Sequence, residues 1–239
     1  MFMSALWAYL VVDPLIYLST MLFGTINLFV SLFDKVGNAQ MVIARIWARS
    51  LLLIAGVRIT AEGLEKIDLS RPFVIATNHA SYFDTPVILD KIGLQFRFLA
   101  REGLFKIPLL GTHLKLAGHV PVAQKDPRAA LRSMRKAADN IREKGISMLI
   151  FPEGGRTRDG KLQEFKEGVA YIAIKAGVPI IPIGLTGTRD IVAMGSAIVR
   201  RGTVTLRVGD PISTEGLSLK DRQKLTDEVR ERVQALIGE

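Results

Sequence analysis

Residues 14–33 contain no charged side chain and are rich in Leu, Ile, Phe and Met, which restricts the fold of the chain more than any other feature. A helix of about twenty apolar residues is long enough to cross the hydrocarbon core of a bilayer. Residues 1–12 are also uncharged, but this stretch is too short to cross. Asp13 and Pro14 lie between the two stretches and are typical of a helix cap and a first helical turn. The sequence therefore predicts two membrane-embedded helices that are broken near Asp13 and Pro14.

Two alternatives to a membrane anchor start from the same residues. A cleaved signal peptide is disfavoured, because Lys and Arg are missing before the apolar run and no clean small-residue cleavage site follows it. A hairpin of two helices buried in the core of a soluble protein stays open. So does the choice between a helix pair that lies in one leaflet and one that crosses the bilayer.

The charge of the chain is concentrated outside this segment. The whole chain has a net charge of +9, whereas its first 40 residues hold only Asp13, Asp34 and Lys35 as charged residues. An apolar N-terminus joined to a basic body is typical of a protein at an anionic membrane surface. A basic body would also suit nucleic acid, but the sequence has no zinc-finger spacing or aromatic RNA-binding signature, so no nucleic-acid partner is expected.

From about residue 41, short β-like runs alternate with helical stretches. This alternation predicts an α/β fold with a largely parallel central sheet flanked by helices, over residues 41–239. Residues 1–40 are expected to form an N-terminal two-helix membrane-associating motif ahead of it. The expected strands are 57–62, 73–77, 97–100, 119–122, 147–151, 179–183 and 203–208, and the expected helices are 41–55, 86–92, 104–116, 127–144, 165–176 and 219–237.

A polar cluster follows the second expected strand, where open α/β sheets place their sites. His79 and Asp84 are five residues apart, which on one continuous helix would separate them by about 140°. Across a turn that leads into a helix, however, the carboxylate can fold back onto the imidazole. A carboxylate on Nδ1–H leaves Nε2 free to act as a general base. The alternative is a loop histidine and an aspartate that only caps the helix.

A second cluster follows the fifth expected strand. Gly154 and Gly155 allow the backbone to approach a ligand closely. Arg156 and Arg158 carry forked donors that can clamp a phosphate. The alternative is a solvated charged loop.

Several other chemistries are disfavoured. Cysteine is absent, which excludes disulfides, thiolate zinc sites and a cysteine nucleophile. The run from Gly155 to Lys161 resembles a P-loop, but Leu162 stands where a magnesium-binding hydroxyl would be needed. No G-x-S-x-G elbow is present. His113 and His119 have no third histidine close in sequence, so no metal site is expected, although His79 could join them in space.

Four ordered blocks of the sequence resemble the glycerolipid acyltransferases, specifically the bacterial 1-acyl-sn-glycerol-3-phosphate acyltransferases. His79 and Asp84 match the H-x-x-x-x-D block, residues 98–111 resemble the second block, residues 151–156 resemble F-P-E-G-T-R, and residues 178–183 match the fourth. Any one block is weak evidence, but four in order are specific.

Two positions depart from the family pattern. Gly155 stands where the family has Thr, a change expected to affect loop rigidity more than chemistry. Gln124, followed by Lys125, stands where the family usually has Arg near the end of the second block. The second change removes an expected phosphate contact, so it makes the identity of the acceptor less certain.

The resemblance implies transfer of a fatty acyl group from acyl-CoA or acyl carrier protein to the sn-2 hydroxyl of lysophosphatidate, giving phosphatidate for phospholipid biosynthesis. In that reaction His79 would be the general base and Asp84 would orient it. No metal or cofactor is required, because the acyl thioester is a co-substrate. The expected location is the inner (cytoplasmic) membrane, with the site facing the cytoplasm.

The same resemblance implies which residues bind the acceptor. Arg156 would bind the phosphate of the acceptor. Glu153, in the Glu153–Gly154 turn, would position the glycerol or Arg156 itself. Arg101 and Lys106 would make further contacts with the phosphate. Two alternatives stay open: an acyltransferase for another lysolipid, such as a lyso-ornithine lipid or another lysophospholipid, and a membrane protein that binds anionic lipid without catalysis.

Overall fold

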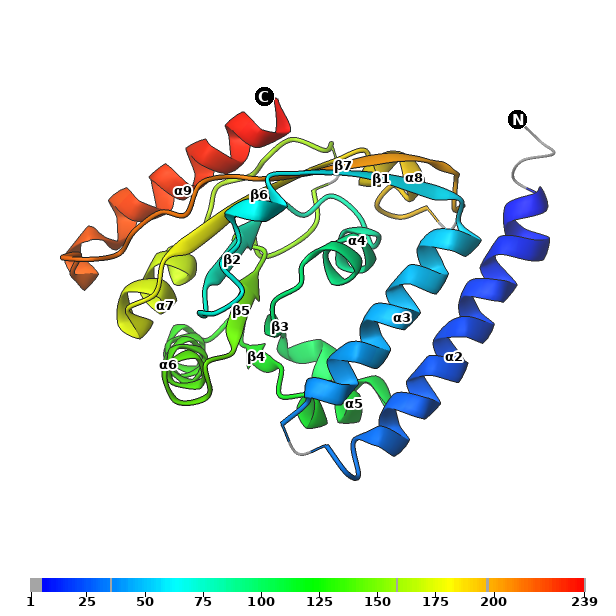
Figure 1. Ribbon diagram of the computed structural model, residues 1–239, viewed down its shortest axis with the longest axis horizontal. Helices are drawn as coiled ribbons and strands as arrows, with labels where there is room; N and C mark the ends of the chain where they lie inside the picture. Colours follow the sequence, from blue (N-terminus) through cyan, green and yellow to red (C-terminus); the bar gives the residue numbers. More distant parts are fainter. Residues whose placement is uncertain (1–5, 35, 158, 197, 239) are drawn as a thin grey trace.

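The computed structural model describes residues 6–34, 36–157, 159–196 and 198–238. In this part of the chain a seven-stranded sheet has the order β1-β7-β6-β2-β5-β3-β4 (Figure 1). Every neighbouring pair is parallel except β6 and β7, which are antiparallel. The strands are β1 (Val57–Glu62), β2 (Val74–Thr77), β3 (Phe96–Arg101), β4 (Val120–Val122), β5 (Ser147–Ile150), β6 (Ile180–Thr186) and β7 (Gly202–Val208).

Helices cover both faces of the sheet, and β2 supplies alternate residues to the two cores. Ile75 packs in the cluster under α3 and α4, while Val74 and Ala76 pack in the cluster under α6, α7 and α9. A parallel strand buried on both faces is expected to be continuously apolar. The helices are α2 (Asp13–Val30), α3 (Asn38–Ile54), α4 (Asp84–Lys91), α5 (Leu110–Leu116), α6 (Pro127–Lys144), α7 (Gly168–Ala176), α8 (Thr188–Ile191) and α9 (Arg222–Ile237). The predicted α/β fold with a largely parallel sheet is confirmed.

The predicted break at Asp13 and Pro14 is wrong. A π-helical turn, η1 (Ala8–Val12), runs directly into α2, and the two form one continuous helix. Proline has no N–H and its ring crowds the carbonyl four residues earlier. The wider π turn just before Pro14 accommodates both the missing N–H and the bulk of the ring, so the helix does not end there.

The helix that pairs with α2 is therefore α3, which the sequence placed in the α/β body. The two pack as a hairpin, so a boundary at residue 40 falls inside the first turn of α3. The turn between them is held by Asp34, whose carboxylate accepts the backbone N–H groups of Gly37 and Gln40. The buried Arg97 of β3 donates to the carbonyl of Val36 at 2.7 Å and fastens this turn to the sheet.

The outer side of α2 is largely uncovered. The helical segment Ala8–Val30 spans 23 residues. Its most apolar 18-residue window has a mean hydropathy of 1.5, and only 11% of this window is buried. A helix in a soluble core would be mostly covered, so the exposure of α2 argues against the buried-hairpin alternative. Residues 1–5 of the expected anchor lie outside the described part of the chain.

The expected helix at 104–116 is two elements instead of one. A 3-10 turn, η3 (Glu102–Lys106), is separated from α5 by Pro108 and by Leu109, which has a φ of 64°. The chain turns so tightly here that a Cβ on Gly111 would lie 2.1 Å from the carbonyl oxygen of Phe105. Two further 3-10 turns, η2 (Leu64–Lys66) and η4 (Leu219–Asp221), complete the described elements.

Candidate active site

The two sequence clusters meet at one edge of the sheet. The strands β2, β5, β3 and β4 are parallel neighbours, so their carboxyl ends, and the loops that follow them, lie side by side. These loops carry His79 after β2, Glu153 to Arg156 after β5, Arg101 at the end of β3, and Gln124 after β4. The fold thus gathers residues that are up to 77 positions apart in the sequence, from His79 to Arg156.

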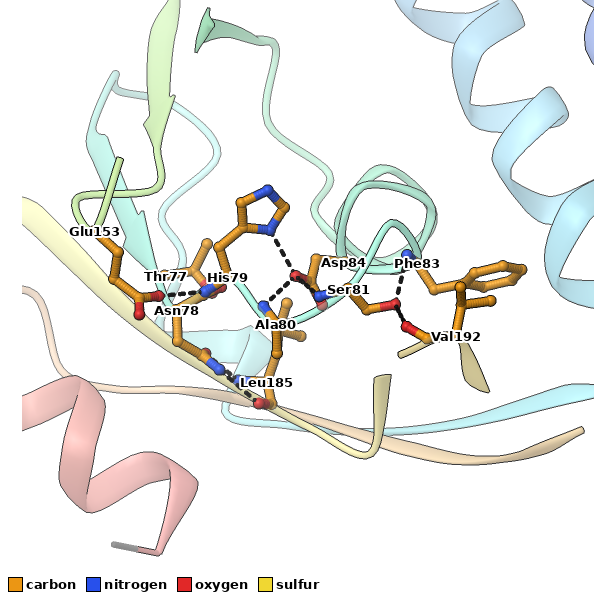
Figure 2. Close-up of polar contacts among 10 residues, drawn as sticks. All are labelled: Thr77, Asn78, His79, Ala80, Ser81, Phe83, Asp84, Glu153, Leu185 and Val192. Atoms are coloured by element: carbon orange, nitrogen blue, oxygen red, sulfur yellow. Dashed lines mark hydrogen bonds and ion pairs between the residues drawn. The ribbon is translucent and has the colours of Figure 1, made fainter. Parts of the chain in front are cut away.

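His79 and Asp84 are in contact, as the strand–turn–helix pattern predicted. The Oδ2 atom of Asp84 accepts hydrogen bonds from His79 Nδ1 at 2.7 Å, from the N–H of Ala80 at 2.8 Å and from the N–H of Ser81 at 2.9 Å (Figure 2). Because a carboxylate oxygen accepts hydrogen bonds, Nδ1 of His79 is the donor to Asp84, and Nε2 is the ring nitrogen without this partner.

The surroundings hold this pair in place. The Asp84 side chain is fully buried, while that of His79 is 19% exposed. The imidazole stacks on Phe151 with ring centres 3.9 Å apart. Asn78 anchors the loop behind the pair, because its side-chain amide bonds both the N–H and the carbonyl of Leu185 in β6.

Glu153 braces the backbone of His79. One carboxylate oxygen accepts the N–H of His79 at 2.6 Å and the other accepts the N–H of Gln163 at 2.9 Å. The N–H of Thr157 in turn donates to the carbonyl of His79 at 3.1 Å. The loops after β2 and β5 are therefore locked together at His79, a function for Glu153 that the sequence patterns did not indicate.

Three cationic side chains surround the Gly154–Gly155 turn. Arg101 donates to the carbonyl of Gly154 at 2.9 Å, and Gln124 donates to the same carbonyl at 3.2 Å. Arg156 lies with its guanidinium over the exposed ring of Tyr82. The ammonium group of Lys166 lies only 2.5 Å from the position that a Cβ on Gly154 would take. A positively charged rim with two glycines at its centre suits an anionic group.

The glycine at position 155 has a physical explanation. A Cβ at this position would lie 2.3 Å from Nη2 of Arg101. The guanidinium of Arg101 thus occupies space that a threonine side chain would need. Arg101 reaches the loop after β5 through this space, and a larger side chain at position 155 would require its guanidinium to shift.

The predicted cationic residues differ in their placement. Arg101 and Arg156 line a common cavity with His79, whereas Lys106 at the end of η3 is exposed and is not among the lining residues. Arg158 lies outside the described residues. Lys166 was not singled out from the sequence. The only sequence feature that could have indicated it is its place next to Phe165, just before a helix.

The cavity has a volume of about 1080 Å³ and its lining is mostly apolar. Cavities of this size accommodate a large ligand. One end lies against the α2–α3 hairpin and the other reaches α6 and the first turn of α7. The residues that line it include Met21, Gly24, Leu28, Met41, Ala44, Phe98, Leu99, Ala130, Met134 and Val169.

His113 and His119 also line this cavity, on the side next to β3. Their ring centres are 6.4 Å apart, and Nδ1 of His119 accepts the N–H of Phe98 at 2.9 Å. Burial, and then the neighbouring His113 and Arg97, lower the pKa of His119 to about 3. Burial also lowers the pKa of His113. A neutral His119 that accepts the N–H of Phe98 therefore stabilises β3.

Comparisons with known proteins agree with the geometry of this site. A family model described as Acyltransferase matches residues 58–186 of the chain. A chloroplastic 1-acyl-sn-glycerol-3-phosphate acyltransferase of Brassica napus is 35% identical over 208 residues, which is 86% of this chain and 58% of the relative. A second one, from Arabidopsis thaliana, is 36% identical over 187 residues, which is 77% of this chain and 52% of the relative. The chain thus spans little more than half the length of these relatives.

A solved structure matches over almost the whole chain. The crystal structure of the 1-acyl-sn-glycerophosphate acyltransferase PlsC from Thermotoga maritima superimposes with a TM-score of 0.77 at 26% sequence identity. The match covers 95% of this chain and 95% of that one.

Proposed function

The chain belongs to the Acyltransferase family, and from this premise we propose that it moves a fatty acyl group from a thioester of coenzyme A or acyl carrier protein to the sn-2 hydroxyl of 1-acyl-sn-glycerol 3-phosphate. The observation that carries the proposal is the orientation of His79. Its Nδ1 is held by Asp84, so its free Nε2 is the nitrogen left to face the cavity that the ring lines.

The reaction needs one general base. Nε2 of His79 takes the proton from the sn-2 hydroxyl while the oxygen attacks the thioester carbonyl. The tetrahedral intermediate collapses, the carbon–sulfur bond breaks, and the thiolate takes the proton back from the imidazolium. The negative charge of Asp84 stabilises that imidazolium. General-base assistance of this kind contributes roughly 10²–10⁴ in rate.

The cationic rim is the proposed acceptor site. Arg156 and Arg101 have forked donors that can bind a phosphate in pairs. Both approach the Gly154–Gly155 turn, which Glu153 and Thr157 join to the backbone of His79. A phosphate at this rim would hold the glycerol hydroxyl near Nε2. A lysolipid without a phosphate would lose these contacts.

The exposed side of α2 is the proposed membrane contact. Pulling a lysolipid out of a bilayer costs about 0.8 kcal/mol for each methylene exposed to water. The apolar cavity begins at the α2–α3 hairpin, so an acceptor can enter it from the lipid side without leaving apolar surroundings. We place the protein at the inner membrane, with its basic body and its active site on the cytoplasmic side.

The function is tested by a panel of acceptors and donors. Release of free thiol and formation of diacyl product are measured with acyl-CoA and with acyl carrier protein, against lysophosphatidate, lysophosphatidylcholine and a lyso-ornithine lipid. The proposal predicts lysophosphatidate as the preferred acceptor and phosphatidate as the product. It also predicts that Arg156→Ala raises KM for lysophosphatidate more than KM for the thioester.

The opposite results are equally clear. Preference for an acceptor without a phosphate monoester, together with no effect of Arg156→Ala, would assign the site to another lysolipid. Binding of anionic lipid with no thiol release from any pair would make the protein a lipid-binding protein.

A further inference from the structure

The solvent side of α6 carries a stripe of positive charge that the proposed chemistry does not use. Arg128, Arg132, Arg135 and Lys136 are all exposed and recur at helical spacings of three, four and seven residues, so they share one face. Lys125 extends the stripe just before the helix. These five residues are called the α6 basic face below.

The α6 basic face is not neutralised within the protein. None of its five residues takes part in the ion pairs formed among the described residues. The carboxylate of Asp126 is occupied as the helix cap, accepting the N–H groups of Arg128 and Ala129. Like charges four residues apart destabilise a helix. A stripe that lowers the stability of α6 is expected to have a polyanionic partner that offsets the repulsion.

The opposite side of the same helix lines the active-site cavity. Ala130 and Met134 face the cavity from α6. Gln124, Pro127 and Lys166 also line it and are exposed, so the cavity reaches solvent beside the first turn of α6. A partner seated on the α6 basic face would therefore lie next to an entrance to the site.

This entrance is distant from the proposed membrane contact. The α2–α3 hairpin packs on the side of the sheet that α4 covers, and α6 packs on the other side (Figure 1). A bilayer that covers the exposed side of α2 lies across the sheet from the α6 basic face. The position favours a water-soluble polyanion over the lipid surface.

The proposed function already requires a water-soluble substrate, the thioester donor. Resting on that function, we propose that the α6 basic face docks an acidic acyl carrier protein, whose thioester-bearing arm enters the cavity beside Pro127 and Lys166. Coenzyme A can use the same entrance, but its negative charge is confined to the phosphates at its nucleotide end. A folded acidic protein presents carboxylates over a surface as long as the stripe, which extends over about three turns from Lys125 to Lys136. The acceptor then enters from the hairpin end and the donor from the α6 end, so that the two substrates meet at His79.

The test compares the two donors in a charge-neutralised variant. Arg128→Gln, Arg132→Gln and Lys136→Gln are combined, because glutamine has nearly the same helix propensity as the residues it replaces. The matched control combines Lys175→Gln, Lys220→Gln and Lys224→Gln, which remove the same charge from exposed positions on α7, η4 and α9. Rates are measured with lysophosphatidate in vesicles of neutral lipid. The same acyl chain is supplied either as the carrier-protein thioester or as the coenzyme A thioester. Circular dichroism checks that each variant keeps its helix content.

The proposal predicts that the α6 variant loses roughly tenfold in kcat/KM with the carrier protein, since charges at the edge of an interface act mainly on association. Its rate with acyl-CoA stays within about twofold of the wild type, and the control keeps both rates. The rate with carrier protein also falls with added salt, less steeply in the α6 variant.

Four results would overturn the docking surface. One is an equal loss with both donors, and another is an equal loss in the control. The third is weaker binding of the α6 variant to anionic vesicles with unchanged carrier-dependent rates, which would make the bilayer the partner. Transfer from acyl-CoA but never from carrier protein would also overturn it and leave the proposed function standing. No transfer from either donor would refute the function itself.

Discussion

The guanidinium carbon of Arg156 lies 3.5 Å from the centre of the Tyr82 ring, and Tyr82 is 62% exposed. A cation over an aromatic face is attracted by the electrons of the ring. One guanidinium nitrogen of Arg156 is buried without a hydrogen-bond partner among the described residues. Tyr82 therefore orients Arg156 and leaves a donor available for a phosphate.

The first prediction follows from this contact. Tyr82→Ala is expected to raise KM for lysophosphatidate roughly fivefold, because a cation–π contact contributes about 1 kcal/mol. Tyr82→Phe keeps the ring and is expected to stay close to the wild type. Steady-state kinetics with either substrate varied checks both. A rise in KM for the thioester alone, or a loss in the phenylalanine variant equal to that in the alanine variant, would contradict the role of the ring.

The second prediction concerns Gly155 and Arg101. Gly155→Ala places a Cβ where Nη2 of Arg101 now lies, so Arg101 must move and KM for lysophosphatidate must rise. In an Arg101→Ala background the same change should add little, giving a coupling of about 1 kcal/mol in a double-mutant cycle. Gly103→Ala is the matched control, because a Cβ there meets no atom within 4 Å. Additive effects of the two substitutions would show that Gly155 acts independently of Arg101.

The third prediction concerns the exposed side of α2. Leu18→Gln and Leu22→Gln together should weaken co-sedimentation with vesicles, because burying one leucine in an apolar phase contributes about 1.5–3 kcal/mol. The melting temperature should change little, since both side chains are exposed. High salt should not release the wild type, because apolar burial is not screened. Leu217→Gln, an exposed leucine near η4, is the control. Unchanged sedimentation of the double variant would exclude α2 as the anchor.

The fourth prediction is a pH dependence of stability. The pKa of His119 is about 3 in the folded protein, against 6.5 for the ordinary side chain. The unfolded state therefore binds more protons between these two values, and stability falls as pH drops from about 6.5 towards 3. Thermal unfolding at pH 7.5 and 4.5 measures this loss.

His119→Asn separates His119 from other titrating groups. The asparagine carbonyl can still accept the N–H of Phe98, but it does not titrate. The melting temperature of both proteins should fall between pH 7.5 and pH 4.5. This fall should be smaller in the variant than in the wild type, by roughly 4 °C or more. An equal loss in both proteins would show that His119 does not titrate on unfolding.

Local sequence signals predicted much of this fold. Asp126 caps α6, Pro127 begins it and Gly145 ends it in the left-handed conformation, so the helix has the bounds that the sequence predicts. The contact of His79 with Asp84 was also predictable, because a strand followed by a short turn and the start of a helix brings the carboxylate back next to the imidazole. These features depend on neighbours in the chain.

The features that the sequence did not predict depend on distant residues or on unusual backbone geometry. The π turn before Pro14 and the positive φ of Leu109 are backbone solutions that no residue type marks. The approach of Arg101 to Gly155, and of Lys166 to Gly154, exists only because neighbouring loops meet at one sheet edge. The pairing of α2 with α3 is likewise a result of packing.

The most direct test of the account is the rate of phosphatidate formation from lysophosphatidate by the His79→Ala variant. The wild type and the Lys175→Gln variant serve as references, because Lys175 is exposed on α7 and does not line the cavity. We predict that His79→Ala loses at least roughly 10²-fold in kcat, with its melting temperature and its vesicle binding retained. Turnover by folded His79→Ala at the rate of the wild type would contradict the account.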